Sequence, residues 1–139
     1  MKFWDSSAIV PLITIETESN TAKDLLTADP TMLVWMITTT EVHSALYRKF
    51  RGHDLSEKGL NEALHRLKHL SSAWSEVTNI EKTRQRANRL LAIHPLRAAD
   101  ALQLAAALVA FEDQPEGESF LTFDHNLSQA ARMEGFQVN

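Results

Sequence analysis

The sequence predicts an α/β domain with a mainly parallel β-sheet. Short apolar runs of strand length alternate along the chain with longer segments whose apolar residues recur at helical spacing. The run 32–37, Met-Leu-Val-Trp-Met-Ile, contains no polar residue, as expected of a strand that is buried on both faces. Because strands joined by helices pair in parallel through right-handed crossovers, a sheet covered by helices follows.

The first half of the chain gives clear boundaries. In order, we predict a strand at 2–4, a short helix at 6–10 with Pro11 after it, a helix at 17–29 stopped by Pro30, and the strand at 32–37. Thr38 and Glu41 fit a capping box, in which the Glu41 side chain reaches back to the Thr38 backbone. This helix runs to about Phe50 and ends at Gly52.

The second half centres on the segment 97–111. It is rich in Ala and Leu and apolar almost all round, which predicts a helix in the middle of the fold. Asp100 lies in its first turn. The remaining elements are helices at 56–71 and 80–94, a weaker strand at 73–77, a polar loop at 112–118, a strand at 119–123, a helix after Asp124 and a last strand at 135–138.

The composition is that of an ordinary globular protein. The 139 residues suit a single domain over 1–139, with 44% hydrophobic and 23% charged residues. The absence of Cys excludes disulfides, thiolate chemistry and Cys-based metal sites. No apolar run approaches the roughly 20 residues of a membrane helix, and Asp5 falls where a signal peptide would be apolar. We therefore expect a cytoplasmic protein that does not associate with membranes.

The charges are unevenly distributed. The net charge is −4, yet residues 48–97 carry +6 and the rest of the chain carries −10. Two clusters of basic residues stand out. The first is Arg48, Lys49 and Arg51, and the second is Lys82, Arg84, Arg86, Arg89 and Arg97. We expect these side chains to hold phosphates of a nucleic acid, with binding that weakens steeply as salt is raised. The alternative is a set of solvated helix faces.

Four acids fall where the strands of a parallel sheet end. Asp5 and Asp124 directly follow strands, Glu41 lies just beyond the second strand, and Asp100 begins the core helix. Ligands of open parallel sheets bind at this edge. Each acid also has a purely structural explanation, since Asp5 and Asp124 could be helix N-caps, Glu41 part of the capping box, and Asp100 a partner of the helix dipole.

Carboxylates gathered at one place repel one another, and a hard divalent cation removes that conflict. All-oxygen ligation suits Mg²⁺ or Mn²⁺, which supports hydrolysis of a phosphodiester. The histidines are weaker candidates: His65 and His69 are four residues apart, and His125 follows Asp124, but no His-Glu-x-x-His pattern occurs. Gly-rich phosphate-binding motifs are absent, so no nucleotide-cradling loop is expected.

At this point the chain resembles a known family, the PIN-domain endoribonucleases of the bacterial VapC toxin type. The matching segments are Phe3–Val10 with Asp5, Thr40–Leu46 with Glu41, Leu96–Ala105 with Asp100, and Leu121–Leu127 with Asp124. They cover the whole chain in the order and spacing of the family. Trp4 is bulkier than the family's usual aliphatic residue, and His125 and Asn126 stand where the family often has Arg.

The resemblance implies a PIN-like three-layer α/β/α fold with about five parallel strands. It implies catalytic Asp5, Glu41, Asp100 and Asp124, with Asp5 and Asp100 as direct ligands of Mg²⁺ or Mn²⁺ and the other two acting through water or a second metal. Ser6 and Thr122 would be supporting hydroxyls. It further implies RNA cleavage, homodimers and inhibition by a cognate antitoxin, for which an Arg inserted against the carboxylates is one means.

Two alternatives to an endoribonuclease toxin remain at this stage. One is another metal-dependent phosphoesterase or a DNase, which the residues separate from a ribonuclease only through the resemblance. The other is a catalytically weak domain of the same fold that binds RNA or a protein partner. The presence of all four acids argues against the second alternative.

Overall fold

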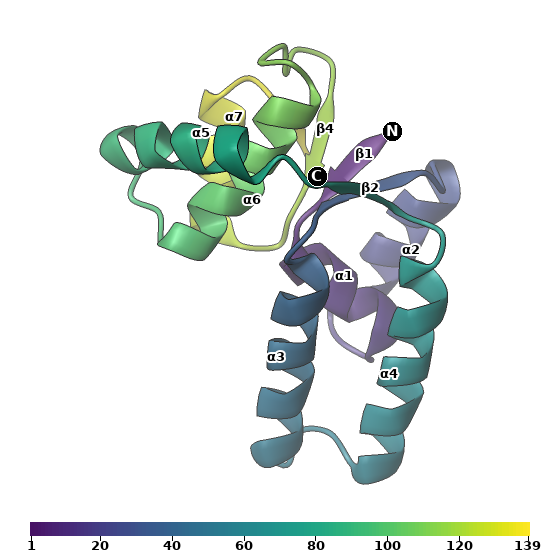
Figure 1. Ribbon diagram of the computed structural model, residues 1–139. Coiled ribbons are helices and arrows are strands. Elements are labelled where there is room, and N and C mark those ends of the chain that lie inside the picture. Colours follow the sequence, from purple (N-terminus) through teal and green to yellow (C-terminus); the bar gives the residue numbers. More distant parts are fainter.

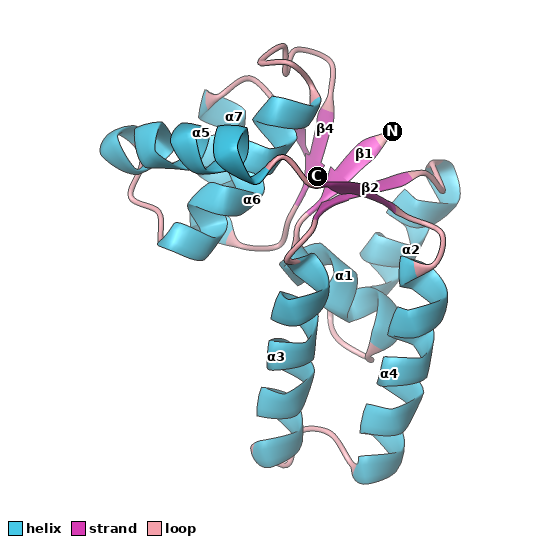
Figure 2. Ribbon diagram, in the orientation of Figure 1, coloured by secondary structure: helices cyan, strands magenta, loops and turns pink.

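The computed structural model describes residues 1–139 and contains one five-stranded sheet whose strands are all parallel. The spatial order is β3-β2-β1-β4-β5. The direction of strand succession reverses between β1 and β4, and such switch points are where open parallel sheets bind ligands. The strands are β1 (Lys2–Trp4), β2 (Met32–Trp35), β3 (Ser75–Val77), β4 (Ser119–Leu121) and β5 (Gln137–Val138) (Figure 2).

Seven helices cover the two faces of the sheet, which gives the three layers that the resemblance implies (Figure 1). One face carries α1 (Ser6–Ile13), α2 (Ser19–Ala28), α3 (Thr38–Arg51) and α4 (Glu57–Ser71). The other face carries α5 (Ile80–Ile93), α6 (Ala98–Ala110) and α7 (His125–Met133). No helix is long and apolar enough to cross a membrane.

Each face of the sheet has its own apolar core. Trp4, Val34 and Leu121 pack toward α1, α3 and α4, whereas Phe3 and Phe120 stack with ring centroids 5.3 Å apart beneath α6 and α7. Consecutive residues of one strand therefore serve opposite cores. This explains why the strands appear in the sequence as uninterrupted apolar runs.

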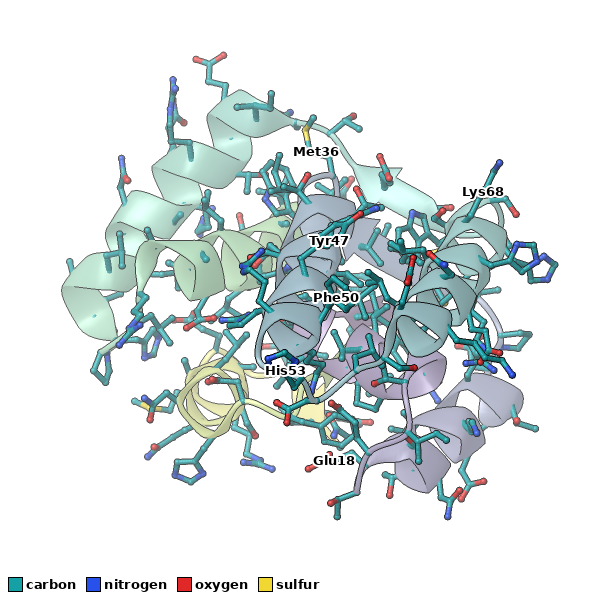
Figure 3. All side chains as sticks on the ribbon, turned by 90° about the horizontal axis from the view of Figure 1, so that it is seen from below. Glu18, Met36, Tyr47, Phe50, His53 and Lys68 are labelled. Atoms are coloured by element: carbon teal, nitrogen blue, oxygen red, sulfur yellow. The ribbon has the colours of Figure 1, made fainter.

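Two long helices extend the molecule on the α1 side. α3 and α4 pack side by side and project away from the sheet, joined by a short loop (Figure 1). Gly52 caps the end of α3, and the Ser56 hydroxyl accepts a hydrogen bond from Gly59 N at the start of α4. Figure 3 shows Tyr47 and Phe50 on α3 and Lys68 on α4, on the underside of the molecule.

Two local predictions are wrong. The first helix does not stop before Pro11 but continues through it to Ile13, because Pro11 and Ile13 are buried against the neighbouring helices and that burial offsets the missing backbone donor. The capping box at Thr38 does not form: Thr38 is inside α3, and the cap residue, Ile37, makes no side-chain cap. β1 spans Lys2–Trp4 as predicted, but the other four strands are shorter than predicted, with β2 ending at Trp35.

Candidate active site

Asp5 leaves the end of β1 at the centre of the sheet and is almost fully buried, with 3% of its surface exposed. It is the N-cap of α1, and Oδ2 accepts hydrogen bonds from Ser7 N at 3.2 Å and from Ser7 Oγ at 2.5 Å. Thr122 Oγ1 donates to the same oxygen at 2.9 Å. The structural explanation of Asp5 is therefore observed, and its carboxylate is fixed where β1 ends.

The hydroxyls around Asp5 also join β1 to β4. Ser7 Oγ lies 3.0 Å from Thr122 Oγ1 and accepts from Phe123 N, while Thr122 Oγ1 accepts from Asp124 N. The family resemblance implies Ser6 and Thr122 as the supporting hydroxyls. Ser6 Oγ is 3.5 Å from the carboxylate, so Ser7 is the closer residue and one the sequence alone did not single out.

Asp124 stands across the switch point from Asp5, at the end of the β4 segment. It is the N-cap of α7, and its Oδ1 accepts a hydrogen bond from Leu127 N at 2.8 Å. The cap uses one carboxylate oxygen, so the other is available to the site. Both acids predicted as possible caps do cap helices, and both lie at the same edge of the sheet.

Glu41 is in the first turn of α3, and its partner comes from a distant part of the chain. Gln103, fully buried in α6, donates from Nε2 to Glu41 Oε1 at 2.6 Å and to Thr38 Oγ1 at 3.1 Å. The Glu41 carboxylate therefore accepts from the Gln103 amide and not from the Thr38 backbone N–H, as a capping box would require. A hydrogen bond to a buried donor is favoured because a buried amide left without an acceptor costs more free energy than an exposed N–H that can bind water. Gln103 Oε1 has no hydrogen-bond partner, so the amide is oriented by its donor side alone.

Asp100 lies in the first turn of α6 and is half-buried. Its pKa is raised to about 6, mainly by burial and also by the charges of Asp124 and Asp5, while the charge of Arg97 lowers it. Burial likewise raises the pKa of Glu41 to about 7; the Gln103 hydrogen bond opposes this, and the Asp5 and Asp100 charges add to it. The charges of Asp5 and Asp100 act on Glu41, and those of Asp5 and Asp124 act on Asp100, so the structure brings the four acids together.

Burial also raises the pKa of Asp5, although hydrogen bonds from Ser7 and Thr122 oppose the change. None of the four acids is in an ion pair. A group of buried and half-buried carboxylates without an ion-pair partner, all of them oxygen donors, fits a hard divalent cation. No three Asp, Glu or His side chains are arranged to hold an ion together, so one or two carboxylates would bind it and water or substrate oxygens would complete its shell.

The predicted basic clusters are resolved into residues with different roles. Lys49 forms an ion pair with Glu16, and Arg86 forms one with Asp113 at 2.5 Å. Arg48 has no partner in the chain and lines a pocket of about 450 Å³ that also contains Glu41. A second basic pocket of about 510 Å³, lined by Lys82, Arg86 and Arg89 among others, lies by the end of α6 that is far from Asp100.

The histidines do not join the acids. His65 and His69 are exposed on α4, and His125 is exposed at the start of α7. The buried one is His94, whose Nε2 lies 2.6 Å from Glu134 Oε1 and ties the end of α5 to the end of α7. His94 therefore has a structural explanation.

Comparison with known proteins identifies the family. The family model of the PIN domain matches residues 2–133. Two curated relatives from Mycobacterium tuberculosis, Ribonuclease VapC45 of strain CDC 1551 and Ribonuclease VapC49 of strain H37Rv, are each 32% identical over 136 residues. Each alignment covers 98% of this chain and 92% of the relative.

Solved structures share the fold. The toxin VapC20 of Mycobacterium tuberculosis, described as cleaving the sarcin–ricin loop, aligns with a TM-score of 0.66 at 20% identity over 94% of this chain and 95% of its own. FitAcB from Neisseria gonorrhoeae aligns with a TM-score of 0.68 at 15% identity, covering 99% and 96%. With the relatives above, they confirm the resemblance noted in the sequence: this chain belongs to the PIN domain family, and within it to the ribonucleases of the VapC type.

Proposed function

We propose that this VapC-type endoribonuclease toxin hydrolyses RNA with Mg²⁺ or Mn²⁺ held at the site of Asp5, Glu41, Asp100 and Asp124. The observation that carries the proposal is the meeting of four carboxylates at one sheet edge, from the N-caps of α1 and α7 and the first turns of α3 and α6, with no ion pair to neutralise them. Such an arrangement costs stability in the metal-free protein, so a stability role alone does not account for it.

The residues of the site would have four roles. Asp5 and Asp100 would bind the metal, which when bound supplies a polarised phosphoryl oxygen and a water of lowered pKa. Ser7 and Thr122 fix Asp5 in one orientation. Glu41, with a pKa raised to about 7, is suited to accept and return a proton near neutral pH. Asp124 is placed to orient a water through the carboxylate oxygen that its cap leaves unused.

RNA would approach this edge past Arg48 of α3 and Arg97, and its more distant phosphates would meet the basic pocket of α5, which lies by the far end of α6. Lys82, Arg84 and Arg89 form no ion pair, and Arg97 lies close enough to Asp100 to lower its pKa. Positive charge beside an acidic site lets a polyanion approach without cancelling the field that would hold the metal. We also propose a cognate antitoxin that blocks this edge, and a homodimer, which the exposed Ile80, Leu91 and Ile93 of α5 support.

The test is cleavage of total RNA by purified, antitoxin-free protein in Mg²⁺ or Mn²⁺, with EDTA and the Asp100→Asn variant as controls. We expect discrete fragments that disappear in both controls. Metal titration calorimetry on the same samples separates the alternatives. A protein that binds metal without cutting RNA points to a different phosphoester substrate, and one that binds no metal points to a binding-only domain.

A further inference from the structure

The pocket beside Glu41 has a composition that the four carboxylates do not explain. Its walls come from α1, α3 and the start of α6, and its volume of about 450 Å³ falls in the range of small-ligand sites, roughly 300–1,000 Å³. Its lining is Ser6, Ser7, Val10, Thr40, Glu41, Ser44, Ala45, Arg48 and Ala99. Hydroxyls and one cation therefore surround a space that opens directly from the acidic site.

Three polar side chains of this pocket make no contact that the fold needs. Ser7 binds Asp5, but the hydroxyls of Thr40 and Ser44 and the guanidinium of Arg48 make no hydrogen bond or ion pair within the chain. The neighbouring Lys49, by contrast, is engaged with Glu16. Thr40, Ser44 and Arg48 are all exposed, so the three are free to meet a ligand.

The spacing on α3 sets these groups in a row. Glu41, Ser44 and Arg48 follow at three and four residues, which places them on one helix face. Arg48 lies seven residues beyond Glu41, roughly 10 Å along the helix axis. A cation this far along the helix is better placed to bind a neighbouring phosphate of the same strand than the phosphate under attack at the carboxylates.

We propose that this pocket binds the RNA nucleotide flanking the scissile phosphate, with Arg48 on its phosphate and the hydroxyls of Thr40 and Ser44 on its ribose. This inference rests on the proposed function. A guanidinium matches a phosphate in bidentate geometry, and hydroxyls can bond the ribose 2′-OH, the group by which a protein distinguishes RNA from DNA. The pocket then selects RNA at a position next to the cut.

The test uses synthetic RNA that spans a cleavage site mapped in total RNA. A series of these oligonucleotides carries a single 2′-deoxy nucleotide at each position near the cut. With the unmodified protein, we expect one flanking position at which the deoxy substitution lowers kcat/KM about tenfold, the usual effect of losing one such hydrogen bond. In the double variant Thr40→Val/Ser44→Ala that penalty should disappear at that position alone.

The cation is tested separately. Arg48→Gln should raise KM about tenfold with a smaller change in kcat. Arg132→Gln, the same substitution on an exposed residue at the far end of α7, should leave KM unchanged. The substituted residues are all exposed, so the circular dichroism spectrum and the melting temperature of each variant should match those of the unmodified protein. They are Thr40, Ser44, Arg48 and Arg132.

Two results would overturn the pocket assignment while the proposed function stands. One is cleavage by Arg48→Gln that equals cleavage by Arg132→Gln, and the other is a deoxy penalty that persists in the double variant. Either result overturns the assignment even if the same variants no longer bind the antitoxin. Such a loss would mean that the pocket binds a protein partner instead of RNA. Failure of the unmodified protein to cut any RNA with metal overturns the proposed function and the pocket together.

Discussion

The β1–β4 half of the candidate site and the α3–α6 half hold their carboxylates in different ways. Asp5 and Asp124 cap helices and accept hydrogen bonds from backbone N–H groups, and Asp5 accepts two more from hydroxyls. Glu41 has one partner, the Gln103 amide, and Asp100 has no hydrogen-bond partner in the chain. In the first half folding itself orients the acids, whereas in the second half charge is buried with little compensation.

This difference separates acids that stabilise the fold from acids that do not. A helix cap stabilises a protein by about 1 kcal/mol, so Asp5 and Asp124 have a reason to exist in any member of this architecture. Glu41 and Asp100 have raised pKa values and contribute repulsion in the absence of a cation. The α3–α6 half therefore carries the clearer sign of function.

The largest effect expected is the loss of cleavage in Asp100→Asn. Removing the charge should lower kcat/KM by about 10²–10⁴-fold, while the melting temperature of the metal-free protein stays the same or rises, because repulsion from Asp5 and Asp124 is relieved. Asp24→Asn, on the exposed surface of α2, is the matched control and should change neither property. Normal cleavage with a lower melting temperature would mean that Asp100 serves the helix dipole instead.

A direct comparison of the two halves comes from Asp5→Ala and Asp100→Ala in the metal-free protein. We expect Asp5→Ala to lower the free energy of unfolding by about 2 kcal/mol, because a cap is lost and the Ser7 and Thr122 hydroxyls lose their acceptor. Asp100→Ala should cost less than half of that amount. Urea denaturation monitored by Trp fluorescence measures both values, and equal losses would contradict the division.

The third prediction concerns pH. Glu41 and Asp100 bind protons more tightly in the folded state than in the unfolded state, whose pKa values are near 4.5 and 3.8. The free energy of unfolding must then fall as pH rises from about 4 to 7, the reverse of the usual behaviour of paired acids. After allowance for solvent at the half-exposed carboxylates, we expect a loss of about 1 kcal/mol across that range.

The control for this pH effect is the variant Glu41→Gln, which should flatten the dependence between pH 5 and 7. Millimolar Mg²⁺ or Mn²⁺ should raise the melting temperature more at pH 8 than at pH 5, because the cation binds the ionised carboxylates. A stability that rises with pH in the metal-free protein would show that the carboxylates are compensated by groups outside the set.

Much of this arrangement could be predicted from the sequence because it is local. Asp5 follows β1 directly and Asp124 lies three residues beyond the end of β4, and a residue just past the end of a parallel strand lies at the ligand-binding edge wherever the strand sits in the sheet. The buried helix of Asp100 was predicted from its composition alone, and its Gln103 to Leu108 segment is indeed buried.

The rest could not be predicted because it depends on contacts between distant segments. Thr38 and Glu41 have the spacing of a capping box, but Gln103, 62 residues from Glu41 in sequence, binds both side chains and displaces the local motif. Gln103 itself stands among Ala and Leu, so periodicity assigns it to the core without indicating what its amide does. Its signal was the presence of one polar residue in an otherwise apolar helix face.

The smallest effect on stability is expected at Gln103. This residue binds Glu41 of α3 and belongs to α6, the helix of Asp100. Gln103→Leu keeps the side-chain volume and also removes the unpartnered Oε1, so the free energy of unfolding should change by less than about 1 kcal/mol. Without the amide, Glu41 loses its only hydrogen bond in the chain, and its pKa should rise further. The pH profile of kcat should then shift toward higher pH, with kcat at pH 7 reduced about tenfold and KM little changed. A lower kcat with an unshifted pH profile would mean that Gln103 only fills space between α3 and α6. Gln103→Asn retains an amide on a shorter side chain. If the amide is what matters, the pH profile of this variant should lie between those of Gln103→Leu and the unmodified protein.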